Sequence, residues 1–142
     1  MKPHQYRLGR GAVLWRANLA ARSLQGKDLA GAYLTWAYLG DADLSNVNLV
    51  GAYLTGATLT CTNLKDANLS DADFSGATLW GADLSGADLS GANFGGSFGD
   101  ENTRWPEGFD PLAAGVAMQK SRTSVRSNKT RGQTDILPAK RG

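Results

Sequence analysis

The sequence predicts an all-β solenoid, in which the chain winds into stacked coils around a narrow apolar core. From Leu14 to Phe94 every fifth residue is Leu or Phe, seventeen times without a break. Two places before the centre stands a small residue in most units, and it is Ala in thirteen of the seventeen. A period of five fits neither an α-helix nor a flat strand, so the pattern indicates a repeat architecture.

Side chains within one unit are expected to alternate between the inside and the outside of the coil. In residues 81–85 (GADLS), an extended backbone points the Ala and the Leu to one side and the Asp between them to the other. Leu and Ala therefore form the interior, and Asp, Asn, Ser, Thr or Tyr face water.

The corners of the coil are predicted from the residue two places after each centre. This residue is Gly nine times and Asp or Asn four times, and these types tolerate the positive φ that a type II turn requires. Four corner residues depart from this rule, and the sequence leaves room for a different local turn there: Arg16, Ala21, Trp36 and Cys61.

A repeat of twenty residues favours four units per coil. Phe74 and Phe94 are twenty residues apart and then stack in one interior column, while Arg16 and Trp36 share a corner. Seventeen units make about four coils, and the usual spacing between strands gives a rod about 20 Å tall.

The units resemble the A(D/N)LXX repeat of the pentapeptide-repeat family. The resemblance spans roughly residues 12–96 and is carried by segments such as ADLSG at 82–86 and ANLSD at 67–71. It implies a right-handed quadrilateral parallel β-helix. Residues 103–111 (TRWPEGFDP) are similar to the WPEGFDP terminator found in cyanobacterial members.

Both ends of such a rod need covering, because an open coil exposes apolar rings and unpaired backbone. Residues 1–11 are expected to form an N-terminal lead-in or cap before the β-helix at 12–96. Residues 12–26 keep the five-residue phase, which favours a first coil, although they also fit a helix ending at Gly26. Arg22 and Lys27 occupy inward positions there and are expected to reach out through the open end.

The C-terminal cap is predicted at residues 97–120 and contains a short helix. Asp110 suits the N-cap of that helix and Pro111 its first position. The predicted lid over Phe94 consists of this helix with Phe98, Trp105 and Phe109. The polar, basic residues 121–142 are predicted to be a disordered tail.

The composition argues against an enzyme. The single His4 lies outside the repeat and the single Cys61 has no histidine in its unit, so neither a catalytic triad nor a metal cluster can be composed. We therefore predict no catalytic residue, no cofactor and no metal. No apolar run approaches the length of a membrane span and no secretory signal follows Met1, so a cytoplasmic location is expected.

Charge is strongly segregated along the chain. Residues 1–27 carry six basic and no acidic side chains, whereas residues 28–110 carry twelve acidic and two basic ones, a net charge of −10. Residues 111–142 carry seven basic and one acidic side chain. An acidic rod disfavours direct nucleic-acid binding, while the basic tail allows it.

Two surface features are candidates for function. The first, the aromatic patch, consists of Tyr33, Trp36, Tyr38 and Tyr53. Stacking between coils would explain this patch structurally, and a protein interface would explain it functionally. The second, the acidic wall, consists of Asp28, Asp43, Asp66, Asp71, Asp83 and Asp88.

The sequence thus predicts a rigid, non-catalytic module that binds another protein, as a monomer or weak dimer. The family resemblance implies an alternative, since some members are acidic rods that mimic DNA and bind type II topoisomerases such as gyrase. The negative belt at residues 28–110 is compatible with this alternative, but the short rod and its basic ends are not.

Overall fold

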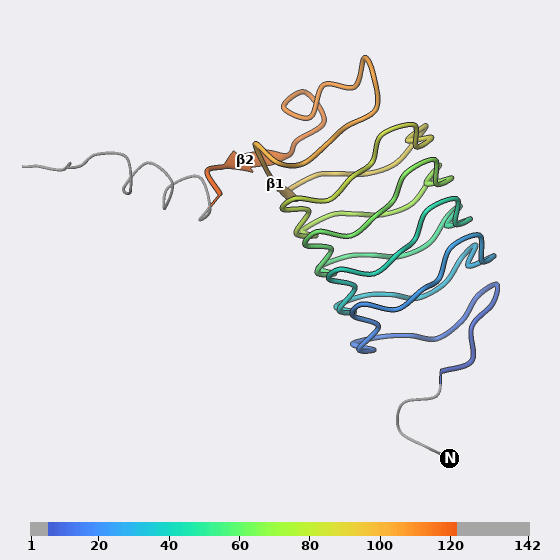
Figure 1. Cartoon of the computed structure of the whole chain (residues 1–142). Helices are drawn as coiled ribbons and strands as arrows, with labels where there is room; N and C mark the ends of the chain where they lie inside the picture. The colour runs from blue at the N-terminus through green and yellow to red at the C-terminus, as the bar shows by residue number, and fades with distance from the viewer. Residues whose placement is uncertain (1–5, 122–142) are drawn as a thin grey trace, which may run out of the picture.

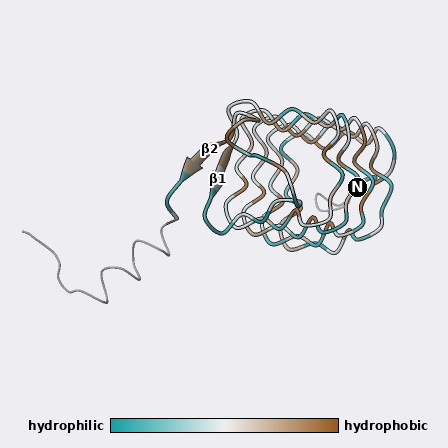
Figure 2. Cartoon of the chain, turned by 90° about the horizontal axis from the view of Figure 1, so that it is seen from above, coloured by the Kyte–Doolittle hydropathy of each residue, from teal (hydrophilic) through white to brown (hydrophobic). Residues whose placement is uncertain are grey.

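The computed structural model describes residues 6–121, which wind into a rod of stacked coils (Figure 1). Parallel bridges join outward residues that are twenty positions apart, so one coil contains four five-residue units. Seen from above, the coils superpose into a frame (Figure 2). The bridged columns define four faces: a first with Val13, Tyr33, Tyr53, Asp73 and Asn93, a second with Asn18, Tyr38, Thr58, Thr78 and Phe98, a third with Ser23, Asp43, Asn63, Asp83 and Arg104, and a fourth with Asp28, Asn48, Asn68 and Asp88.

Backbone hydrogen bonds hold each coil to both of its neighbours. The amide of Tyr33 donates to the carbonyl of Ala12 in the coil before, at 2.8 Å, and that of Leu34 donates to Tyr53 in the coil after, at 2.7 Å. The amide of Ala37 closes the corner by donating to the carbonyl of Leu34, at 3.0 Å. This pattern recurs along the rod and satisfies backbone groups that burial would otherwise leave unpaired.

The interior consists of the Leu and Phe centres and the small residues two places before them. Leu34, Leu54 and Phe74 lie in one column and are at most 1% exposed. Phe74 and Phe94 stack with ring centroids 4.9 Å apart and an angle of 4° between the rings. The predicted interior column is therefore present.

The corners of Arg16, Ala21, Trp36 and Cys61 correct one expectation. These residues take φ angles of 55°, 60°, 61° and 57°, so they adopt the same left-handed conformation as the glycine corners. Backbone hydrogen bonds between coils hold the chain on both sides of each corner. They therefore impose the same positive φ at every corner, even where the side chain disfavours it.

Residues 13–26 form a coil and no helix, since Val13, Asn18 and Ser23 bridge to the coil that follows. At this end the hydroxyl of Tyr6 accepts the amide of Asn18 at 3.1 Å. The guanidinium of Arg22 lies 5.6 Å from the centre of the Tyr6 ring, and Lys27 is exposed. Both cations thus avoid unpaired burial in the core.

At the C-terminal end the predicted short helix is wrong. Residues 111–115 form a turn, followed by strand β2 (Ala117–Gln119), which pairs in parallel with strand β1 (Phe98–Asp100). No helix occurs within residues 6–121. Asp110 does accept the amides of Leu112 and Ala113, as an N-cap would, but the positive φ of Gly115, 93°, ends the segment after a single turn.

The lid over Phe94 is made by Trp105 and Phe109, whose ring centroids lie 5.5 and 5.6 Å from that of Phe94. Phe98 is not part of it, which corrects the prediction: Phe98 bridges to Thr78 and belongs to the outer second face. The predicted basic tail falls, apart from Ser121, outside the described residues.

Candidate functional site

The aromatic patch is divided between two adjoining faces and the corner that joins them. Tyr33 and Tyr53 lie on the first face and Tyr38 lies on the second, while Trp36 occupies the corner. The exposed fractions of Tyr33, Trp36, Tyr38 and Tyr53 are 42%, 57%, 55% and 45%. These four rings are therefore accessible to a partner.

Stacking between coils accounts for two of the four rings. Tyr33 and Tyr53 are bridged neighbours, and their ring centroids are 5.0 Å apart with an angle of 8° between the rings. Such a cross-strand pair stabilises a sheet by roughly 0.2–1 kcal/mol. Tyr38 and Trp36 make no ring pair of this kind within residues 6–121, so stacking does not explain them.

The backbone of a glycine corner supports the Trp36 ring. A Cβ atom added to Gly56 would lie 2.7 Å from Cε3 of Trp36, so the indole packs directly on the Gly56 backbone. Since no side chain other than hydrogen fits between them, Gly56 holds the indole close to the second face.

Trp36 and Tyr38 line a groove of about 580 Å³ that runs along the second face in the direction of the rod. Its remaining lining residues are Arg16, Gly56, Thr58, Gly76, Thr78 and Phe98. Sequence reasoning did not find this groove, although the twenty-residue spacing of 38, 58, 78 and 98 was a usable signal. Tyr33 and Tyr53 lie outside its lining.

Replacing Gly56 with Ala should displace the Trp36 indole. Both Gly56 and Gly51 have positive φ, 68° and 66°, so alanine at either corner costs roughly 1–2 kcal/mol in backbone strain. Only at Gly56 does the new methyl group meet the indole, because a Cβ at Gly51 meets nothing within 4 Å. We expect the indole N–H resonance of Trp36 to shift in Gly56→Ala and to stay in Gly51→Ala. Equal shifts in both variants would contradict the contact.

The acidic wall is largely a set of turns. Asp43 Oδ1 accepts both the amide of Ser45 at 3.1 Å and its hydroxyl at 2.7 Å. Asp88 accepts the corresponding pair from Ser90 at 3.0 and 2.6 Å, and Asp83 does the same with Ser85. Aspartate side chains commonly close turns by accepting the amide two residues ahead. The outward Asp between the Ala and the Leu of a unit therefore stabilises the turn that follows it.

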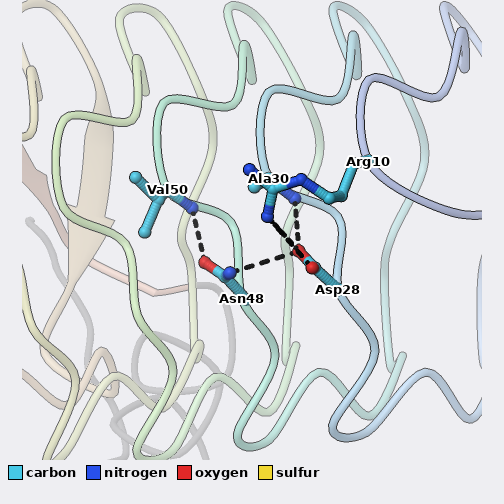
Figure 3. A network of polar contacts seen from close by, with 5 residues as sticks. All are labelled: Arg10, Asp28, Ala30, Asn48 and Val50. Carbon is cyan, nitrogen blue, oxygen red and sulfur yellow. Dashed lines mark hydrogen bonds and ion pairs between the residues drawn. The ribbon is translucent and has the colours of Figure 1, made fainter.

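Asp28 belongs to a polar network that links the first coils (Figure 3). Arg10 Nη1 lies 3.0 Å from Asp28 Oδ2, and Asn48 Nδ2 donates to Asp28 Oδ1 at 3.1 Å. The amides of Ala30 and Val50 close the turns of Asp28 and Asn48. Arg10 thereby neutralises one carboxylate of the wall.

The two corner residues of the wall lie against glycines of the next coil. A Cβ at Gly86 would clash with Oδ1 of Asp66, and one at Gly91 would clash with Oδ1 of Asp71. The wall is also diluted by amides, because Asn63 stands between Asp43 and Asp83 on the third face. The structure therefore does not concentrate these carboxylates into one site.

Hydrogen bonding lowers the pKa of several carboxyls on these faces. The hydroxyl and then the amide of Ser45 hold the pKa of Asp43 below its usual value of 3.8, and Ser90 does the same for Asp88. The hydrogen bond from Arg10 is the main cause of the lowered pKa of Asp28. Burial favours a higher pKa for Asp83. The hydrogen bonds from the Ser85 hydroxyl and amide act in the opposite direction, and the pKa of Asp83 lies below its usual value.

Acid should therefore weaken the rod. A carboxyl whose pKa is lower in the folded state stabilises that state fully above its unfolded pKa, near 3.8, and loses this effect as the pH falls through the folded value. We expect the melting temperature, followed by circular dichroism, to fall between pH 5 and about pH 2.

The sequence itself suggests a control for acid sensitivity, because asparagine takes the place of aspartate in one of these turns. Asn68 accepts the amide of Ser70 at 3.2 Å and its hydroxyl at 2.8 Å, so asparagine serves in the same turn. The variant carrying Asp43→Asn, Asp83→Asn and Asp88→Asn should fold at neutral pH and lose less stability in acid. An unchanged acid sensitivity in this variant would exclude these turns as its source.

The described residues offer no metal site and no membrane-crossing helix. Within 6–121 no three His, Cys, Asp or Glu side chains are grouped so that they could hold a metal ion. Over the same residues, no helix is long and apolar enough to cross a membrane. Cys61 is exposed at its corner and lines, with Trp80, Asp100 and Lys120, a cleft of about 600 Å³ near the C-terminal end.

Comparison with known proteins places this geometry among repeat proteins. The family model for pentapeptide repeats matches residues 37–76 and 62–98. The pentapeptide-repeat protein Rfr23 from the cyanobacterium Cyanothece 51142 is 34% identical over 72% of this chain and 78% of its own, with a TM-score of 0.67. The pentapeptide-repeat protein alr5209 from Nostoc PCC 7120 is 41% identical over 78% of this chain and 86% of its own, with a TM-score of 0.55.

A further similar structure is HetL from the cyanobacterium Nostoc sp. strain PCC 7120, a pentapeptide-repeat protein involved in the regulation of heterocyst differentiation. It is 30% identical over 70% of this chain and 49% of its own, with a TM-score of 0.58. No curated protein sequence matches this chain at a significant level. These solved structures imply a right-handed β-helix solenoid here.

Proposed function

This chain belongs to the pentapeptide-repeat family, and we propose that it acts as a rigid, non-catalytic module that docks another protein through the aromatic patch. The observation that carries the proposal is the exposure of Trp36 and Tyr38 on a rod whose backbone is bonded coil to coil. Tyr and Trp are frequent anchors of protein interfaces, because they bury a large area at low cost in conformational entropy.

The rigidity of the rod supports this proposal. Tyr33, Tyr38 and Tyr53 are held by the ladders of their faces, and the Trp36 indole rests on Gly56. A partner therefore finds these rings already in place, so less conformational entropy is lost when it binds. The similarity to HetL, which takes part in regulation, is consistent with a regulatory partner for this chain.

The test is the loss of partners when the patch is removed. The full chain with Tyr33, Trp36, Tyr38 and Tyr53 replaced by Ser is compared with wild type as bait in cells that naturally contain the protein. We expect the patch variant to lose the wild-type partners in quantitative mass spectrometry, while its circular dichroism stays that of the wild type.

A control variant separates the patch from the rest of the surface. Gln25→Ser and Lys65→Ser together change two exposed residues at the corner between the third and fourth faces. This variant should keep every partner of the wild type. The proposal fails if the patch variant keeps the same partners, or if the control variant loses them as well.

The contacts of the acidic wall favour docking over DNA mimicry. A DNA-like surface presents regularly spaced, unpaired negative charges, whereas here Asp28 is paired with Arg10 and the fourth face carries amides at Asn48 and Asn68. A gyrase supercoiling assay with excess protein should accordingly show no inhibition. Inhibition that disappears when Asp43, Asp83 and Asp88 become Asn would instead support the DNA-mimicking role.

A further inference from the structure

The groove on the second face has a shape that suits an extended chain. Trp36 and Tyr38 stand near one end and Phe98 near the other, three coils further along the rod. At the usual strand spacing this separation is about 14 Å, the length of roughly four extended residues. The Trp36 indole covers Gly56, but Gly76 carries no side chain and a Cβ there would meet only the Gly56 nitrogen, at 3.9 Å. The backbone of an occupant can therefore approach the Gly76 corner closely.

A cation without a partner lies at the aromatic end of the groove. Arg16 lines the groove and is exposed, and within residues 6–121 its side chain makes no hydrogen bond or ion pair. The guanidinium of Arg10, by contrast, is held by Asp28. A planar guanidinium binds a carboxylate through two parallel hydrogen bonds, which makes an acidic side chain the complementary group.

Charge also distinguishes an acidic peptide from a nucleic acid. Aromatic rings beside an arginine can bind single-stranded nucleic acid, but such sites need a track of cations along the phosphates. Here Arg16 is followed along the rod by a segment, residues 28–110, with a net charge of −10. Arg16 is the one charged residue among the described residues that line the groove, so a chain of phosphates finds no track of cations there, whereas a peptide with one carboxylate gains the pairing with Arg16.

We propose that this groove binds an extended peptide segment of a partner protein, with an Asp or Glu paired to Arg16 and an apolar or aromatic side chain on Trp36 and Tyr38. This inference rests on the proposed docking function and specifies its ligand. The apolar side chain contributes burial against the two rings, and the carboxylate fixes the register and direction of the peptide.

The experiment selects peptides and then exchanges the charges. A phage-displayed library of random dodecapeptides is panned on the immobilised full chain, and the dissociation constants of the enriched peptides are measured by fluorescence anisotropy. We expect an Asp or Glu beside an apolar or aromatic residue. Arg16→Ala and Trp36→Ala should each weaken binding about tenfold or more, as expected when a charge-assisted hydrogen bond or an anchor ring is lost.

Two controls make the assignment specific. Lys27→Ala removes an exposed cation outside the groove and should leave the dissociation constant unchanged. Arg16→Glu should lose the acidic peptide and bind the same peptide with its acid replaced by Lys. Recovery through this exchange would come only from direct pairing at residue 16.

Other results overturn the inference in distinguishable ways. Peptides that need Tyr33 and Tyr53 but tolerate Arg16→Ala would refute the acidic ligand and leave the docking function standing. Tighter binding of a twenty-nucleotide oligo(dT) through Arg16 would assign the groove to nucleic acid. Self-association abolished by Arg16→Ala would assign it to a second copy of the chain, and a selection without enrichment would refute the groove as a peptide site.

Discussion

Replacing Phe74 with Ala is expected to lower the free energy of unfolding by about 3–5 kcal/mol. Phe74 is completely buried, and its ring lies against Phe94 on one side and the Leu54 layer on the other. Removing the ring leaves a cavity that the coils above and below cannot close, because ladder hydrogen bonds hold them at a fixed spacing. Urea unfolding followed by circular dichroism measures the loss.

Phe74→Leu is the matched control for this cavity. Leu occupies the same column at positions 14, 34 and 54, so the coil geometry accepts it without strain. We expect a loss of less than about 1.5 kcal/mol, since most of the buried volume is kept. Similar losses for the Ala and Leu variants would show that ring stacking, rather than filled volume, stabilises this part of the core.

Replacing Asp100 with Ala should lower the free energy of unfolding by about 1–3 kcal/mol, because it leaves the amides of Gly81 and Asn102 without their acceptor. Asp100 is 4% exposed, and its Oδ1 accepts the amides of Gly81 and Asn102, each at 3.0 Å. The hydroxyl of Thr103 lies 3.1 Å from the same oxygen. This carboxylate takes the place of the carbonyl that a further regular coil would offer to Gly81.

Asp100→Asn keeps the Oδ1 acceptor and serves as the control. It should retain most of the stability that Asp100→Ala loses in the same urea titration. Equal destabilisation of both variants would show that the negative charge of Asp100, rather than the position of its acceptor oxygen, stabilises the end of the rod. An unaffected Asp100→Ala variant would mean that the cap contributes little to the stability of the last coil.

The regular part of the fold could be predicted because each unit repeats the same local pattern. The burial of Leu54 and Ala52 and the exposure of Tyr53 between them follow from alternation in extended chain. The length of one coil, twenty residues, could also be predicted, since Phe74 and Phe94 are the two Phe centres and lie twenty residues apart. These features depend on residues close in sequence or at a constant separation.

The corners and the cap could not be predicted from local preference. Trp36 and Cys61 are poor candidates for positive φ, yet the ladder forces both into it. The cap departs from the period, because Asp83 bridges to Arg104, one residue beyond the regular advance. The segment 97–120 carries a helix signal at Asp110, but pairing of β2 with β1 prevails over it.

The candidate site shows the same division. Tyr33 and Tyr53 could be placed on one face from the period alone, and their stacking confirms it. The alternation likewise placed Asp43 and Asp88 outside, but only the structure shows that Ser45 and Ser90 bind these carboxylates within turns.

The five-residue period by itself determined the coil, its apolar interior and its polar surface, because side-chain direction in extended chain is a local property. Tertiary structure alone decided that Arg16, Trp36 and Phe98 line one groove and that Asp100 closes the last coil. Those contacts join residues about twenty to eighty positions apart, so they exist only once the coils are stacked and the cap has broken the repeat.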